Sequence, residues 1–175
     1  MFSSEWPYAR RVIEELRKAF PQAVIIGGGE HCTALPEKVL ESCPQIDFLV
    51  LGEGEESFLE LIENICSSAP FSQVKGIAYR NKEGKPVRTP PRGRIRNIDD
   101  IPYPSWDLVP MSEYLDRNLG LATMQGRSLP MLASRGCPFQ CTFCSNKDMW
   151  TPRWFPRNPG EILDEFEFRI LELRY

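Results

Sequence analysis

The sequence contains no long apolar run, no block of like charges and only one histidine. Its 175 residues carry 21 Lys and Arg against 24 Asp and Glu, which gives a formal net charge of −3. No stretch approaches the roughly 18 consecutive apolar residues of a membrane helix, and the first residues lack the charged-then-apolar order of a signal peptide. These absences predict a cytoplasmic protein with no membrane span and no nucleic-acid partner.

Cysteine and proline are the informative residue types that are present. Six cysteines in a cytoplasmic chain are expected to be thiols or metal ligands rather than disulfides. Most of the 16 prolines follow residue 85, which predicts a loop-rich second half.

The first third of the sequence alternates helical and strand-like patterns. The predicted elements are a helix at residues 6–20, a strand at 23–29, a helix at 36–43, a strand at 46–55 and a helix at 56–66. This order is typical of a parallel α/β sheet. Because only two strands are present and a helix comes first, we expect residues 1–73 to be the C-terminal half of a doubly wound, Rossmann-like domain.

The pattern changes from residue 74 onward. Residues 76–89 predict a hairpin with its turn at "NKEG", and a proline-rich linker continues to residue 127. Residues 128–134 then predict a strand that leads into three cysteines. The last helix is expected to begin with Asn158 as N-cap and Glu161 as its capping-box partner. Residues 128–175 therefore predict one β/α unit of a larger barrel or sheet.

Cys137, Cys141 and Cys144 are spaced C-x3-C-x2-C. Structural zinc sites usually pair C-x2-C with a distant second pair, and no fourth cysteine or histidine lies nearby. Three thiolates on one loop suit three corners of a cubane iron–sulfur cluster and leave the fourth iron open. The alternatives are a zinc site completed by His31 or another cysteine, and three uncoordinated thiols.

Glycines end both predicted strands, in "IIGGG" and "LVLGEGEES". Glycine lets the backbone approach a bulky ligand or a neighbouring helix closely. The second turn misses the dinucleotide fingerprint G-x-G-x-x-G because Ser57 replaces its third glycine, and its three glutamates would repel a pyrophosphate. The residues alone leave open whether these turns contact a ligand or only connect strand to helix.

The stretch "SRGCPFQCTFCS" resembles the signature of radical S-adenosylmethionine (radical SAM) enzymes, particularly those that carry a cobalamin (B12)-binding domain. The resemblance implies that Cys137, Cys141 and Cys144 ligate a 4Fe-4S cluster and that S-adenosylmethionine chelates the fourth iron. It also implies that Phe143 lies beside the adenine of S-adenosylmethionine.

The stretch from "AVIIGGGEHCTALP" to "LVLGEGEESFLELI" resembles the second half of the cobalamin-binding domain that precedes many radical SAM barrels. This resemblance divides the chain into a partial cobalamin-binding domain (1–73), a hairpin and linker (74–127) and the start of a radical SAM partial TIM barrel (128–175). It implies that the first strands of the cobalamin domain and most of the barrel are not in this sequence. The implied cobalamin contacts are Gly27, Gly28, Gly29, Thr33, Gly52, Glu53, Gly54 and Glu55.

The resemblance implies an enzyme that cleaves S-adenosylmethionine reductively and uses cobalamin to transfer a methyl group to an unactivated carbon. The alternatives are an oxidative cyclase or rearrangement enzyme of the anaerobic tetrapyrrole type, and a non-catalytic iron–sulfur or zinc module. The expected partners are a small-molecule or lipid substrate and an electron donor such as flavodoxin or ferredoxin. No catalytic residue is assigned, and the fragment alone is expected to be inactive.

Other conspicuous residues have simpler interpretations. His31 is expected in a turn, whereas Cys43 and Cys66 lie on apolar helical stripes and are expected in the core. Trp150 and Trp154 follow the cysteine loop, where they either line a substrate cavity or pack over the barrel mouth.

Overall fold

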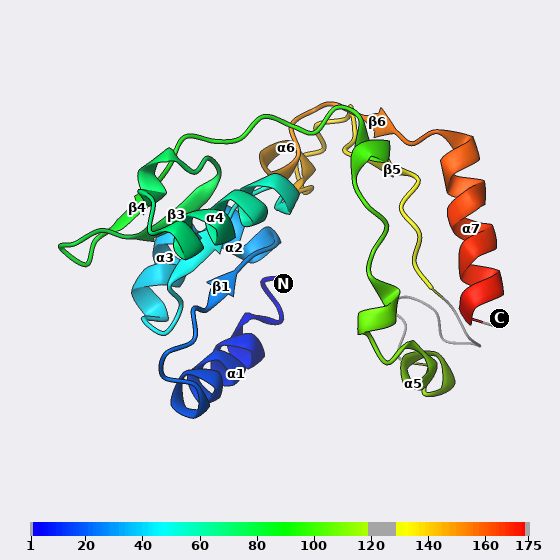
Figure 1. The fold of residues 1–175 in the computed structure, drawn as a ribbon. Helices are drawn as coiled ribbons and strands as arrows, with labels where there is room; N and C mark the ends of the chain where they lie inside the picture. Colours follow the sequence, from blue (N-terminus) through cyan, green and yellow to red (C-terminus); the bar gives the residue numbers. More distant parts are fainter. Residues whose placement is uncertain (1, 119–128, 174–175) are drawn as a thin grey trace. The chain divides into compact units, whose positions relative to one another are not determined.

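The computed structural model describes residues 2–118 and 129–173, and the chain divides into two compact units. The first unit comprises Met1–Ile95 and Phe139–Thr151, and the second comprises Arg96–Pro138 and Pro152–Tyr175. Figure 1 shows the elements of both units along the chain. In the described residues no helix is long and apolar enough to cross a membrane.

The first unit is built on a mixed four-stranded sheet with the strand order β1-β2-β3-β4. Only β1 and β2 are parallel, and the two later strand pairs are antiparallel. The elements are α1 (Trp6–Ala19), β1 (Ile26–Gly27), α2 (Glu30–Ala34), α3 (Pro36–Ser42), β2 (Phe48–Val50), α4 (Glu55–Ser67), β3 (Ile77–Arg80), β4 (Pro86–Arg88) and α6 (Asn146–Met149).

The predicted elements of the first third are present, but the prediction of a purely parallel sheet is wrong. The hairpin predicted at residues 76–89 forms as β3 and β4, and β3 pairs with β2. Its turn is held by the Asn81 side chain, whose Oδ1 accepts the N–H groups of Glu83 at 3.1 Å and Lys85 at 2.9 Å. Because the hairpin covers the free edge of β2, two antiparallel strands extend a sheet that begins as a parallel pair.

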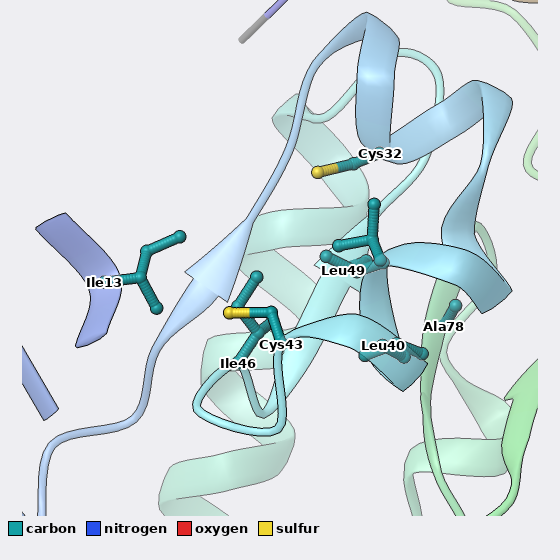
Figure 2. Packing of buried hydrophobic residues seen from close by; sticks show 8 residues of the cluster. Ile13, Cys32, Leu40, Cys43, Ile46, Leu49 and Ala78 are labelled. Carbon is teal, nitrogen blue, oxygen red and sulfur yellow. The ribbon is translucent and has the colours of Figure 1, made fainter. Parts of the chain in front are cut away.

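Both faces of this sheet are covered, as its continuous apolar strand sequences require. On one face Leu49 packs among residues from α1, α2 and α3 (Figure 2). The buried residues of this cluster are Ile13, Cys32, Val39, Leu40, Cys43, Ile46, Leu49 and Ala78. On the other face the neighbouring strand residues Phe48 and Val50 belong to the cluster that contains Leu61 of α4. The alternation along β2 therefore places the sheet between two helical layers.

The second unit contains α5 (Met111–Asp116), β5 (Ser134–Arg135), β6 (Phe155–Pro156), α7 (Pro159–Leu173) and two 3-10 turns at Ile98–Asp100 and Trp106–Leu108. The strand predicted at residues 128–134 begins only at Ser134, and residue 128 lies outside the described residues. β5 pairs with β6 in an antiparallel ladder. The predicted β/α barrel unit is therefore not shown by the described part of the chain.

The start of α7 confirms the predicted N-cap. The N–H of Gly160 donates to Oδ1 of Asn158 at 2.8 Å. The expected capping-box partner Glu161 instead accepts a hydrogen bond from the hydroxyl of Tyr103 at 3.3 Å. Asp99 takes its place, since the N–H of Asn158 donates to Asp99 Oδ2 at 2.9 Å. A residue distant in sequence thus completes the helix start.

Candidate functional site: a glycine-lined hollow and a cysteine loop

The turns that follow β1 and β2 border a shallow hollow of about 370 Å³. The two strands are parallel neighbours, so their carboxyl ends meet at the same edge of the sheet, where ligands bind in open α/β sheets. The hollow is lined by Ile26, Gly27, Gly28, Gly29, Val50, Gly52, Gly54, Glu55 and Phe58. Six of the eight predicted cobalamin contacts are therefore brought together here, leaving out Thr33 and Glu53.

The glycines of these turns are required for different reasons. A Cβ on Gly27 would lie 2.9 Å from Leu49 Cδ2 and 3.4 Å from Cys32 Sγ, so a larger residue would have to displace the buried Leu49 side chain. Gly52 has a φ of +70°, which L residues rarely adopt, yet no atom lies within 4 Å of its Cβ position. Packing explains Gly27, whereas Gly52 presents an open stretch of backbone to the hollow.

Thr33 joins the two glycine turns through its side chain. Its hydroxyl donates to the carbonyl oxygen of Gly29 at 3.0 Å and accepts the N–H of Gly52 at 2.9 Å. The side chain therefore cross-links the turn after β1 to the turn after β2, and Thr33 does not line the hollow itself. This role depends on a contact between residues far apart in sequence, which the spacing of the motif does not reveal.

Glu53 and Glu55 point to different surroundings. Glu53 is buried, and its Oε2 accepts hydrogen bonds from Arg94 Nε at 2.9 Å and from the N–H of Ile95 at 2.8 Å. Glu55 lies in the first turn of α4 and lines the hollow. Of the two acidic residues expected at cobalamin, only Glu55 borders the hollow.

Residues 92–95, which we call the strap, bind the first turns of α4. Nε of Arg92 donates to Oγ of the buried Ser57 at 2.9 Å. Arg92 also forms ion pairs with Glu56, at 3.3 Å, and with Glu60. The prolines that precede this segment predict only a linker. The signal that would have found it is the pair of arginines in "PRGRI", whose charges complement the glutamates of "GEGEES".

Phe58 also lines the hollow, and no sequence motif marks it. It lies on α4, its side chain is 49% exposed, and it borders the hollow beside Gly54 and Glu55. An exposed aromatic ring next to bare backbone provides a flat apolar surface for a large ring system.

His31 lies in α2 rather than in a turn. Its ring stacks on Trp6 with 5.0 Å between centroids, and Nδ1 lies 3.0 Å from Oγ of Ser3. Burial lowers the pKa of His31, which favours its neutral form. Cys43 and Cys66 were both expected in the core. Cys43 is buried, as predicted, whereas Cys66 is exposed, so the prediction is wrong for Cys66.

The cysteine loop is only partly organised. Cys141 is exposed and Cys144 half-buried, and the N–H of Cys144 donates to the carbonyl of Cys141 at 3.1 Å. The N–H of Asn146 points at Cys144 Sγ at 3.5 Å. Phe143 is 91% exposed, and Cys137 is half-buried and belongs to the second unit.

The three cysteines of the loop are divided between the two units, with Cys137 in the second and Cys141 and Cys144 in the first. Within residues 2–118 and 129–173, no group of three His, Cys, Asp or Glu side chains is placed to hold a metal ion. None of the three forms a disulfide, and cysteine thiolates are the preferred donors of iron–sulfur clusters. The donor chemistry of the three cysteines therefore fits a cluster, whose ligands commonly assemble only when the metal binds.

Comparison with known proteins defines the class of the first unit. Residues 1–62 match the family model described as the B12 binding domain. The chain contains a B12-binding domain homologous to that of cobalamin-dependent radical SAM methyltransferases and covers only part of those enzymes.

Two relatives show how much of such proteins the chain represents. An uncharacterized methyltransferase of Pyrococcus horikoshii is 34% identical over 156 residues, which cover 86% of this chain and 32% of the relative. The anaerobic magnesium-protoporphyrin IX monomethyl ester cyclase of Rubrivivax gelatinosus is 34% identical over 166 residues, covering 93% of this chain and 28% of the cyclase. The chain thus spans about a third or less of the length of these relatives.

A solved structure shares the fold. The structure of the cobalamin-dependent S-adenosylmethionine radical enzyme OxsB, with aqua-cobalamin and S-adenosylmethionine bound, aligns with a TM-score of 0.75 at 21% identity. The alignment covers 93% of this chain and 21% of OxsB.

Proposed function

We propose that this chain is the part of a radical SAM enzyme that binds cobalamin and carries the iron–sulfur loop. The observation that carries the proposal is the occurrence, in one chain, of a B12-binding domain at residues 1–62 and a C-x3-C-x2-C loop at Cys137 to Cys144. A zinc module would not account for the first feature, and a simple cobalamin carrier would not need the second.

The hollow supplies the contacts proposed for cobalamin. The peptide groups of Gly28, Gly52 and Gly54 allow a large ligand to approach the backbone, and Glu55 and Phe58 border the same space. Thr33 lies outside the hollow and joins the two turns by its hydrogen bonds to Gly29 and Gly52. Bound cobalamin would supply a carrier for a methyl group.

The cysteine loop supplies the ligands proposed for a 4Fe-4S cluster. Cys137, Cys141 and Cys144 would hold three irons as thiolates, which leaves one iron for the amine and carboxylate of S-adenosylmethionine. The exposed Phe143 is proposed to contact the adenine. A bound cluster would supply the electron for reductive cleavage of S-adenosylmethionine.

The reaction that we propose for the whole enzyme is methyl transfer to an unactivated carbon of a small-molecule or lipid substrate. A flavodoxin or ferredoxin is the proposed electron donor. An oxidative cyclase is the second candidate, because a magnesium-protoporphyrin cyclase is as similar to this chain as the methyltransferase relative, each at 34% identity. We propose that the chain alone lacks activity, since it covers about a third or less of either relative.

Cofactor binding tests the proposal directly. Anaerobic reconstitution is expected to give a brown protein with about four irons per chain, and titration with hydroxocobalamin is expected to saturate at one equivalent. A colourless protein with one zinc would refute the cluster assignment. In a full-length enzyme, transfer of label from S-adenosylmethionine to the product indicates a methyltransferase, and its absence together with 5′-deoxyadenosine release indicates a cyclase.

A further inference from the structure

Arg94 of the strap contacts two segments that are far apart in the sequence. Its Nε donates to Glu53 at 2.9 Å, and its Nη1 donates to the carbonyl oxygen of Trp150. The guanidinium also lies 5.1 Å from the centroid of the Trp150 ring. All three residues belong to the first unit, so one arginine links the turn after β2 to the end of α6.

This arrangement is buried and charged. The side chains of Arg94 and Glu53 are 11% and 5% exposed. Burial of a single charge is costly, so each side chain depends on the other to remain in place. The planar guanidinium can donate in several fixed directions at once, which the point charge of a lysine cannot do. Arg94 is therefore suited to holding two segments at a defined separation.

The segments that Arg94 joins lie beside the two proposed cofactor sites. Glu53 is flanked by Gly52 and Gly54, which both line the hollow. Trp150 ends α6, the helix that follows Cys144. α6 also packs against α2, the helix that carries Thr33.

We propose that the Glu53–Arg94 pair is a positioning device that holds residues 139–151, including Cys141 and Cys144, against the B12-binding domain. The proposal rests on the proposed function for its purpose, although the contacts themselves are independent of any cofactor. Arg94 and Glu53 act through the segments they hold and are not catalytic residues.

Neighbouring arginines provide matched controls. Arg92 belongs to the same strap, and among the described residues its side chain bonds to Ser57, Glu56 and Glu60, which all lie on α4. Arg88 pairs with Glu37 of α3 on the same unit. Replacing either by glutamine removes an arginine ion pair without touching residues 139–151.

Hydrogen–deuterium exchange of the 175-residue chain tests the device without cofactors. The reporters are the N–H groups of Cys144, Met149 and Trp150, which are bonded within residues 139–151. In Arg94→Gln their exchange is expected to be about tenfold faster, the effect of losing one charge-assisted hydrogen bond. Arg92→Gln and Arg88→Gln should leave it unchanged. Equal rates in Arg94→Gln and wild type, or an equal increase in Arg92→Gln, would overturn the proposal.

Two further variants separate positioning from general stability. If Arg94→Gln does not fold, Glu53→Gln tests the proposal instead. The amide oxygen of a glutamine at position 53 can still accept the N–H of Ile95, whereas the ion pair with Arg94 is lost. Faster exchange confined to residues 139–151 supports the proposal, and unchanged exchange overturns it. Arg94→Lys keeps the charge but not the planar fork, so we expect it to retain stability in urea without restoring slow exchange. If Arg94→Lys fully restored slow exchange in residues 139–151, the charge at position 94 alone would hold them, and the planar guanidinium would have no positioning role.

Addition of hydroxocobalamin provides a readout that general stability would not change. We expect cobalamin to slow exchange in residues 139–151 of the wild type but not of Arg94→Gln. Only the wild type has the Arg94 side chain that links these residues to the turn bordering the hollow. Equal slowing in both would overturn the proposal. Failure of the wild type to bind hydroxocobalamin would refute the proposed function, and the exchange rates without ligand would still decide the role of Arg94.

Discussion

The cross-link made by Thr33 gives a quantitative prediction for the glycine-lined hollow. The substitution Thr33→Val keeps the size and branching of the side chain and removes only the hydroxyl. Gly52 then loses the acceptor of its N–H, and the carbonyl of Gly29 loses the hydroxyl donor but keeps the backbone N–H of Thr33. Because Gly52 is only partly exposed, water replaces the lost acceptor only in part, and the conformational freedom of glycine lets the turn loosen.

The expected cost follows from the surroundings of each group. A hydrogen bond contributes about 1 kcal/mol net, and the partly buried N–H of Gly52 should show that full amount. Water reaches the exposed Gly29, so its carbonyl should contribute about half as much. Thr33→Val should therefore lower the free energy of unfolding by about 1.5 kcal/mol, which lowers the urea midpoint by about 0.7 M when the denaturant slope is about 2 kcal/mol per M.

The control is Thr33→Ser, which keeps the hydroxyl and removes one methyl group. It should cost less than about 0.8 kcal/mol. Both variants are compared with the wild type by urea unfolding followed by circular dichroism. In the same variants the affinity for hydroxocobalamin should fall by up to about tenfold for valine and little for serine, because a loosened turn must be ordered on binding. If valine is no more destabilising than serine, the hydroxyl does not join the turns.

Three more predictions concern individual positions. Gly27→Ala should destabilise the first unit by about 1–3 kcal/mol in urea unfolding because its Cβ meets Leu49 at 2.9 Å; adding Leu49→Val should recover part of the loss, and a fully neutral Gly27→Ala would contradict the packing argument. Cys141→Ala should abolish iron binding on reconstitution while leaving the circular dichroism of the chain unchanged, and Cys66→Ser, at another exposed cysteine, should keep full iron content. Burial raises the pKa of Cys32 to about 11 from its usual 9.0, so its thiol should resist iodoacetamide at pH 8 while Cys66 reacts. The folded state holds this proton more tightly than the unfolded state, so the contribution of Cys32 to stability is complete below pH 9.0 and is lost as the pH rises toward about 11, which urea midpoints measured across this range would show.

Local patterns were sufficient for most elements of the first unit. The apolar spacing of α1 and α4, the glycine-ended runs at β1 and β2, and the hairpin turn at Asn81 all rest on neighbouring residues. Their recognition needs no knowledge of the partner element. The short helix α2 escaped prediction because its five residues carry no periodicity.

Contacts between distant segments could not be predicted from such local patterns. The hairpin was expected to lie outside the sheet, yet β3 pairs with β2 and makes the sheet mixed. The apolar residues of α1 are another case, since they recur at helical spacing, yet Ile13 is buried while Val12 and Leu16 are exposed. Helical spacing shows which residues share a face, but only the packing partner decides how much of that face is covered.

The features of the candidate sites likewise fall into those that local sequence predicts and those that depend on tertiary contacts. The sequence by itself determined the glycine turns, the three cysteines and their resemblance to a cobalamin-dependent radical SAM enzyme, because these depend on residue types and spacing along one stretch of chain. Only the tertiary structure decided that Glu53 turns away from the hollow to Arg94, that Thr33 joins the two turns, and that Phe58 borders the space between them. Each of these roles is a contact between residues at least 19 positions apart or an exposure set by the packing of α4, and no local pattern encodes such contacts.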